Sequence, residues 1–229
     1  MESKEPILFE AKHITSRRKG LFQKGQYLDD ISFSLPAGYI MGIVGKNGAG
    51  KTTFFDYIID EKKRYRGEFL LNGADISKNH LSAMNQIGFI SEDNYFFTTM
   101  SIRKNVELLA PFYEEFDHKL FSEKLSEFEL TSGKCVGNLS RGQMMKFQLA
   151  FAMAHKPKLY LLDEATAGMD PVFRLDFYKQ LRLLLEDGCG VILSTHLEEE
   201  IEKQVDYVGI LEEGKMISFG ENEMGGILL

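Results

Sequence analysis

A glycine-rich segment, Gly45 to Thr52, constrains this chain more than any other feature. Its sequence, GKNGAGKT, places two glycines around four residues, directly before lysine and threonine. It follows an apolar run over residues 39–44, typical of a buried strand, and precedes a helical pattern over residues 51–60. In this context the backbone N–H groups can surround an anion, because glycine puts no Cβ in the way. The segment therefore predicts a phosphate-binding site in an α/β fold.

The side chains of this segment have expected roles. The ammonium group of Lys51 can reach the terminal phosphates of a nucleotide, and the Thr52 hydroxyl can ligate Mg²⁺. A glycine-rich turn without a ligand is the alternative, and the predicted strand and helix on either side argue against it. The expected nucleotide-binding residues are Gly45, Lys46, Asn47, Gly48, Ala49, Gly50, Lys51, Thr52 and Thr53.

Two acids, Asp163 and Glu164, follow a second apolar run. Residues 158–162 predict a buried strand, where a carboxylate is costly unless it meets a cation or hydrogen-bond donors. Asp163 is expected to hold Mg²⁺, directly or through water. Glu164 is expected to act as general base or orienting group for the water that attacks the γ-phosphate. Alone, such an acidic pair would more often be a helix cap. The catalytic interpretation therefore depends on the presence of the phosphate loop in the same chain.

The wider pattern alternates apolar strands with helices, which predicts a mostly parallel, doubly wound sheet. Strands are expected over residues 7–14, 27–36, 39–44, 87–90, 158–162 and 190–194, with a hairpin over 208–211 and 215–219. The first two alternate apolar and polar residues and should pair antiparallel, with a loop from Ser16 to Gln26 between them. Residues 101–156 are mainly helical, with Leu108, Leu109 and Phe112 at helix spacing. A later helix should begin after Asp170 at Pro171 and end before Gly188.

Composition excludes several classes of protein. The chain has 229 residues and a net charge of −7, which argues against a nucleic-acid partner. Its two cysteines, Cys135 and Cys189, lack metal-ligand spacing and are expected to be reduced. No stretch approaches the roughly 18 apolar residues of a membrane helix. We therefore expect a cytoplasmic chain that does not insert into the membrane by itself.

One more segment, Leu139 to Gln143, identifies a family. The sequence LSRGQ contains a capping box formed by Ser140 and Gln143, which alone explains a helix start. The segment also resembles the signature motif of ABC ATPases. The phosphate loop, this signature, the acidic strand over 159–164, a D-loop over 167–170 and a switch histidine at His196 then align in order. The resemblance covers nearly the whole chain.

The resemblance implies a single ABC domain over residues 1–229. Its fold would be that of a P-loop NTPase (RecA-like), with a mostly parallel core, an N-terminal antiparallel β subdomain and a helical subdomain inserted at approximately 93–156. ATP and Mg²⁺ would bind between two subunits packed head to tail. Each ATP would meet the phosphate loop of one subunit and the other's signature residues, Ser140, Arg141, Gly142 and Gln143. Glu164 and His196 would be catalytic, and Asp170 would couple the two sites.

The sequence departs from the family pattern at three places. Glu92 ends a segment that resembles the Q-loop, where glutamine is usual; its carboxylate could still approach Mg²⁺. Arg141 replaces the usual signature glycine, which should be tolerated if Ser140 and backbone amides make the contacts. Phe22 and Tyr27 are the candidates for the aromatic residue that stacks on adenine.

The resemblance also implies partners. These are transmembrane permease subunits and a second ATPase subunit, in a homodimer or heterodimer. The chain would lie at the inner face of the cell membrane and would power export, like the separately encoded ATPase of a bacterial exporter. Tyr95, Phe96 and Phe97 could form the groove for the permease, although core packing would explain them equally well. The rival function is a soluble ABC ATPase in an assembly role, such as iron–sulfur cluster assembly. A nucleotide kinase or GTPase would leave residues 139–143 and His196 unexplained.

Overall fold

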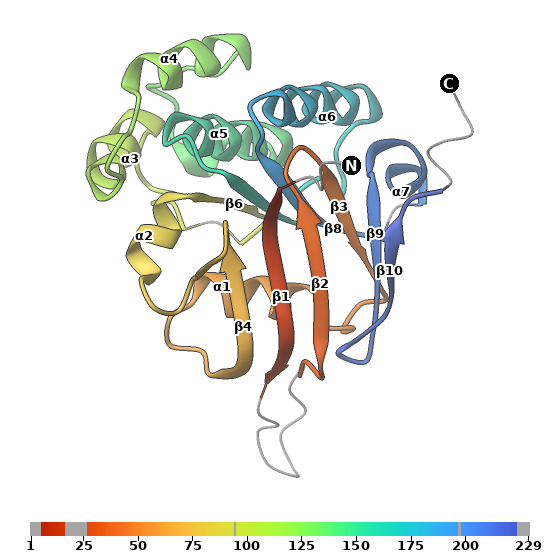
Figure 1. Cartoon of the computed structure of the whole chain (residues 1–229). Helices are drawn as coiled ribbons and strands as arrows, with labels where there is room; N and C mark the ends of the chain where they lie inside the picture. The colour runs from red at the N-terminus through yellow and green to blue at the C-terminus, as the bar shows by residue number, and fades with distance from the viewer. Residues whose placement is uncertain (1–5, 17–26, 94, 197, 224–229) are drawn as a thin grey trace.

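Two β-sheets with helices between and around them form the protein (Figure 1). The computed structural model describes residues 6–16, 27–93, 95–196 and 198–223. A six-stranded sheet has the order β10-β9-β3-β8-β7-β6, in which all neighbours are parallel except β10 and β9. Its strands are β3 (Ile40–Val44), β6 (Ile87–Ser91), β7 (Leu159–Asp163), β8 (Gly190–Thr195), β9 (Tyr207–Glu212) and β10 (Lys215–Glu221). The predicted doubly wound, mostly parallel core is confirmed.

The central strands of this sheet are buried on both faces. Every residue of β7 and β8 is buried, and so are the first four residues of β3. Their apolar sequences suit this position, because helices cover both sides of a parallel sheet. The carboxyl ends of β3, β7 and β8 lie next to one another, and this edge carries the polar residues that the sequence singled out.

The second sheet is antiparallel, with the order β2-β1-β4-β5. It consists of β1 (Ile7–Ser16), β2 (Ile31–Pro36), β4 (Tyr65–Leu71) and β5 (Ala74–Asp75). The pairing predicted for the first two strands is confirmed, but Ser16 belongs to β1 and the second strand begins only at Ile31. The rest of the predicted loop, residues 17–26, lies outside the described residues.

Helix α1 (Lys51–Ile59) lies between the two sheets (Figure 1). Phe54 is fully buried, with its ring 5.6 Å from that of Phe33 on β2 and 5.5 Å from that of Phe69 on β4. The adjacent Phe55 belongs to the same core as Met41 and Leu161 of the parallel sheet. This apolar packing fixes the helix, and with it the phosphate loop that immediately precedes it, against both sheets.

The opposite face of the parallel sheet carries α5 (Arg141–Ala154) and α6 (Pro171–Glu186). The apolar face predicted for α6 is confirmed, since Phe177, Leu181 and Leu184 are buried. The Asp170 side chain caps this helix, and Gly188 takes a positive φ of 72° just beyond its end, as predicted. The remaining helices are α2 (His80–Asn85), α3 (Ile102–Leu109), α4 (His118–Glu127) and α7 (Glu198–Gln204), with 3-10 turns at Ala110–Phe112 and Val136–Asn138.

Phe112 corrects one detail of the helical stretch. Helix α3 ends at Leu109, and Pro111 lies in the following 3-10 turn, so Phe112 does not continue the apolar face of α3. Its side chain is 78% exposed.

The helices α3 and α4 lie at one end of the molecule, beyond α5 (Figure 1). In the part of the chain that the structure describes, no helix is long and apolar enough to cross a membrane. Cys135 and Cys189 are free.

Candidate active site

The phosphate loop connects β3 to α1, as predicted. Gly48 and Gly50 have positive φ values of 83° and 113°, which glycine adopts without strain. A Cβ on Gly45 would lie 2.3 Å from the carbonyl oxygen of Leu211, so this position has no room for a side chain. The loop therefore needs glycine at these three positions for its turn and for its close approach to β9.

Lys51 is 4% exposed, yet its ammonium group has polar partners. Its Nζ donates to the carbonyl oxygens of Gly45, at 2.8 Å, and Lys46, at 3.4 Å. A carboxylate oxygen of Glu164 lies 3.6 Å from the same nitrogen. The loop thus wraps around the Lys51 ammonium group. This group places positive charge at the N-terminal end of α1, where the helix dipole already favours anions.

Asp163 and Ser194 form a buried pair at the ends of β7 and β8. The two residues are opposite each other in the sheet, and the Ser194 Oγ donates to the Asp163 carboxylate at 2.6 Å. Burial raises the pKa of Asp163, and hydrogen bonds from Ser194 and Thr52 partly oppose that rise. A cation beside this carboxylate would stabilise its charged form, and the exposed Thr52 adds a hydroxyl ligand next to it.

Glu164 follows Asp163 in a strained conformation. Its φ is 47°, in the left-handed region that a non-glycine residue seldom adopts. Its backbone N–H donates to the Ser194 Oγ at 2.9 Å. The carboxylate is 33% exposed and lies beside the buried ammonium group of Lys51. Both acids, the lysine and Thr52 therefore meet at one edge of the parallel sheet.

His196 and Asp170 lie near this edge by topology. His196 directly follows β8 and is exposed, so its ring can reach a ligand at the end of the sheet. The Asp170 carboxylate accepts hydrogen bonds from the N–H groups of Val172, at 3.0 Å, and Phe173, at 3.4 Å. The N-cap role of Asp170 is confirmed. The switch role of His196 and the coupling role of Asp170 stay predictions.

The capping box of the signature segment is also confirmed. The Ser140 Oγ accepts from the Gln143 N–H at 3.3 Å, and the Gln143 side chain accepts from the Ser140 N–H at 3.2 Å. Ser140 is exposed at the start of α5. Among the described residues, its hydroxyl makes no hydrogen bond to loop 45–52 of its own chain. The segment thus exposes a serine side chain and a helix N-terminus at the surface of the chain.

Three polar contacts around the site were not predicted from the sequence. Arg141 pairs with Glu92, with 2.9 Å between Nη2 and Oε2. The amide of Gln148 exchanges hydrogen bonds with the backbone of Ser91, and Ser194 holds both acids. The sequence contained a sign of the roles of Gln148 and Ser194, because each is a polar residue directly next to an apolar run of a buried element. The side chain of Glu92 is 61% exposed, and its predicted contact with Mg²⁺ stays a prediction.

The sequence pattern of the ABC transporter family matches residues 28–167, which include the loop, the signature and both acids. The chain belongs to this family. As an ABC transporter ATP-binding protein, it is an ATPase with the fold of a P-loop NTPase. The predicted fold class and enzymatic activity are therefore confirmed.

Individual relatives agree with this assignment. The uncharacterized ABC transporter ATP-binding protein YhcH of Bacillus subtilis (strain 168) is 32% identical over 213 residues, covering 92% of this chain and 68% of the relative. The Nod factor export ATP-binding protein I of Neorhizobium galegae is 29% identical over 205 residues, covering 87% of this chain and 59% of that protein. This chain thus spans about two thirds of such relatives. A solved ATP-binding subunit of an ABC transporter has a TM-score of 0.81 at 25% identity, covering 93% of this chain and 90% of its own.

Proposed function

We propose that this ABC ATPase hydrolyses ATP between two subunits and uses the cycle to drive export through separate transmembrane permease subunits. The observation that carries the hydrolytic part is the meeting of Lys51, Asp163 and Glu164 at one edge of the sheet. Residues 45–53 would bind the phosphates through backbone amides and the Lys51 ammonium group. The protein would act in the cytoplasm, at the inner face of the cell membrane.

The residues at this edge fit a magnesium ion. Thr52 and Asp163 offer the oxygen ligands that Mg²⁺ prefers, and the pKa of Asp163 is raised by burial, which a neighbouring cation would offset. When bound, Mg²⁺ would neutralise charge on the phosphate oxygens. Glu92 is a third candidate, but Arg141 already pairs with its carboxylate.

Glu164 is proposed as the general base. Its carboxylate is partly exposed to water, and its backbone N–H is fixed by Ser194. It would accept a proton from the water that attacks the γ-phosphate, while Lys51 stabilises the charge on the phosphate. His196, at the end of the neighbouring strand β8, would contact the same phosphate. The proposed roles of Glu164, Lys51 and His196 can each be tested by substitution of that side chain.

The signature segment, residues 139–143, supports the proposal that a second subunit completes the ATP site. Ser140 is exposed, and its Oγ accepts from the Gln143 N–H, so the hydroxyl proton could be donated to an ATP held by another chain. The backbone amides of Arg141 and Gly142 would add to this contact at the positive end of α5. Because one chain carries both an intact loop and an intact signature, a homodimer would have two competent sites. A heterodimer with a related ATPase is the other arrangement.

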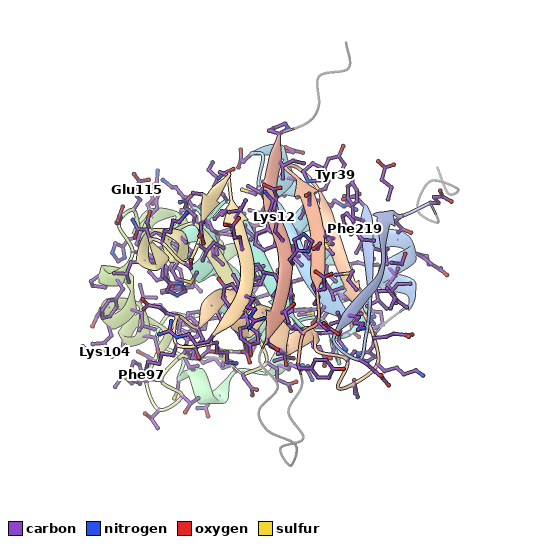
Figure 2. All side chains as sticks on the ribbon, turned by 60° about the horizontal axis from the view of Figure 1, so that its bottom comes forward. Lys12, Tyr39, Phe97, Lys104, Glu115 and Phe219 are labelled. Carbon is purple, nitrogen blue, oxygen red and sulfur yellow. The ribbon has the colours of Figure 1, made fainter. Side chains whose placement is uncertain are left out.

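A groove of about 990 Å³ supports the permease partner. Leu81, Tyr95 and Phe112 line it and are 79%, 71% and 78% exposed. Phe96 also lines it, but its ring packs 4.5 Å from that of Phe147. Phe97 lies outside the lining, near Lys104 at one end of the molecule (Figure 2). We therefore assign Tyr95 to docking of a short apolar helix from the permease, and Phe96 mainly to core packing.

Affinity purification from native membranes in mild detergent tests this assignment. A polytopic membrane protein should copurify in stoichiometric amount with the tagged chain. Leu81→Asp should release it without loss of ATPase activity, because a charge would enter an apolar contact. Ile217→Asp is the matched control, since Ile217 is 57% exposed on β10. Recovery of the tagged chain with soluble assembly proteins would instead support the assembly role, such as iron–sulfur cluster assembly, and contradict export.

A further inference from the structure

Arg141 directs its side chain back onto its own chain. It is the first residue of α5, directly after the signature serine, and its side chain is 34% exposed. Its Nη2 is 2.9 Å from the Glu92 carboxylate and 3.5 Å from the carbonyl oxygen of Glu164. A Cβ placed on Gly168 would lie 3.4 Å from its Nη1. One guanidinium group therefore touches the segments that follow β6 and β7 and the turn before α6.

The planar guanidinium group suits this position, because Nη2 faces two acceptors while Nη1 lies against Gly168. Nη2 carries two N–H groups, one for the carboxylate of Glu92 and one for the carbonyl group of Glu164. A lysine side chain is shorter and has one terminal nitrogen, so it cannot occupy the places of Nη1 and Nη2 together. The Nε of Arg141 is buried without a hydrogen-bond partner in the described part of the chain. Burying that donor costs free energy, which the ion pair with Glu92 helps to offset.

These contacts act on the strained residue of the site. Glu164 has a φ of 47°, and such a conformation persists only where the surroundings hold it. Ser194 accepts its N–H group, and Arg141 donates to its carbonyl oxygen. The two residues thus hold Glu164 from both sides of its Cα. The next glycine, Gly168, also has a positive φ, of 70°, and lies against the same guanidinium group.

We propose that Arg141 is a positioning residue for ATP hydrolysis, which acts by holding the backbone of Glu164 and the turn up to Gly168. Glu92 holds Arg141 in place, so the two charges work as a unit. The inference rests on the proposed role of Glu164 as general base. An ordinary surface ion pair would contribute little and would not affect residues 164–168.

Hydrogen exchange and steady-state kinetics of the full chain test this role. In Arg141→Ala, the backbone amides of residues 165–169 should exchange about fivefold faster or more, because the turn loses its support. The kcat for ATP should fall about tenfold with KM within about twofold, since the base is misplaced while the phosphate loop is intact. Arg141→Lys should rescue neither quantity. Glu92→Ala should produce both changes, and the double variant should be no worse than Arg141→Ala alone.

Lys146→Met provides the matched control. Lys146 is also on α5 and pairs with Asp176 on α6 at 3.3 Å, with no contact to Glu164 among the described residues, so its loss should change neither the exchange of residues 165–169 nor kcat. Unchanged exchange and kcat in Arg141→Ala would overturn the proposal, and so would full rescue by lysine or independent effects of the two charges. The exchange measurement does not depend on the identity of the base. If Glu164→Gln kept full turnover, the proposed function would fail while the structural role of Arg141 would still be measured.

Discussion

The ammonium nitrogen of Lys51 lies 3.6 Å from a carboxylate oxygen of Glu164, although the two residues are on different elements. Lys51 opens α1, and Glu164 follows β7. The Lys51 ammonium group, which is proposed to bind phosphate, thus also neutralises the carboxylate of Glu164, the proposed base. Phosphate oxygens would compete with Glu164 for the ammonium group, so ATP binding would release the carboxylate toward water. Such an exchange of partners would link binding of the substrate to activation of the proposed base.

Replacement of Lys51 by methionine removes the charge and keeps a similar side-chain length. Because charge-assisted hydrogen bonds are lost, ATP affinity should fall about ten- to a hundredfold. Isothermal titration calorimetry with ATP and Mg²⁺ measures this loss. Lys78→Met is the control, since the Lys78 side chain is 79% exposed and pairs with Asp75. Equal ATP affinity in the Lys51→Met and wild-type proteins would contradict the role of Lys51.

Ser194 is expected to matter for both stability and turnover. Its hydroxyl binds the carboxylate of Asp163 and the N–H group of Glu164, and the residue is 1% exposed. Ser194→Ala should therefore lower the free energy of unfolding by about 1–3 kcal/mol and reduce kcat, because two buried polar groups lose their partner. Urea denaturation and an ATPase assay measure the two effects. Ser122→Ala, which removes an exposed hydroxyl on α4, should leave both near wild type, and a loss of the same size there would argue against the interpretation.

His155 should make the protein less stable in mild acid. Burial lowers the pKa of His155 from 6.5 to about 4, although a hydrogen bond to the Asn85 carbonyl opposes the shift. The unfolded chain binds the proton at a higher pH than the native chain. Stability is therefore lost as pH falls from about 6.5 toward about 4, by up to about 3 kcal/mol from this residue.

Substitution of His155 by phenylalanine isolates this effect. The new ring can stack on Tyr113, as the imidazole does with 4.2 Å between ring centroids, but it does not titrate. The free energy of unfolding, measured in urea at pH 7 and pH 5, should then depend less on pH than in the wild type. His118→Gln, at an exposed position on α4, should keep the wild-type dependence. An unchanged slope in His155→Phe would show that the imidazole is not the cause.

Local patterns predicted the parts of the fold that local physics determines. The loop before Lys51 was predictable because its glycine spacing, directly after an apolar strand, is specific to phosphate-binding loops. The α6 boundaries followed from Asp170 and Gly188, which cap a helix wherever it lies. Strand β4 was not predicted, because Gly67 interrupts its alternation. That glycine is needed where β4 meets β1, since a Cβ there would lie 2.3 Å from the Lys12 carbonyl oxygen.

The contacts between distant segments could not be predicted in the same way. Arg141 and Glu92 are 49 positions apart, and their pairing depends on how α5 packs over β6. Each alone was only a departure from the family pattern. The structure shows that these two oppositely charged side chains form an ion pair, with 2.9 Å between Nη2 and Oε2. Likewise, the aromatic run from Tyr95 to Phe97 does not show which ring points into the core.

The central claim is that Glu164 is the base for ATP held between two chains, and Glu164→Gln tests it most directly. Sedimentation velocity with ATP and Mg²⁺, together with phosphate release, should be measured on this variant. We expect ATP to bind, turnover to fall about a hundredfold or more, and a dimer to accumulate that disappears when Lys51→Met is added. Turnover at the wild-type rate, or a chain that stays monomeric with bound ATP, would contradict the account.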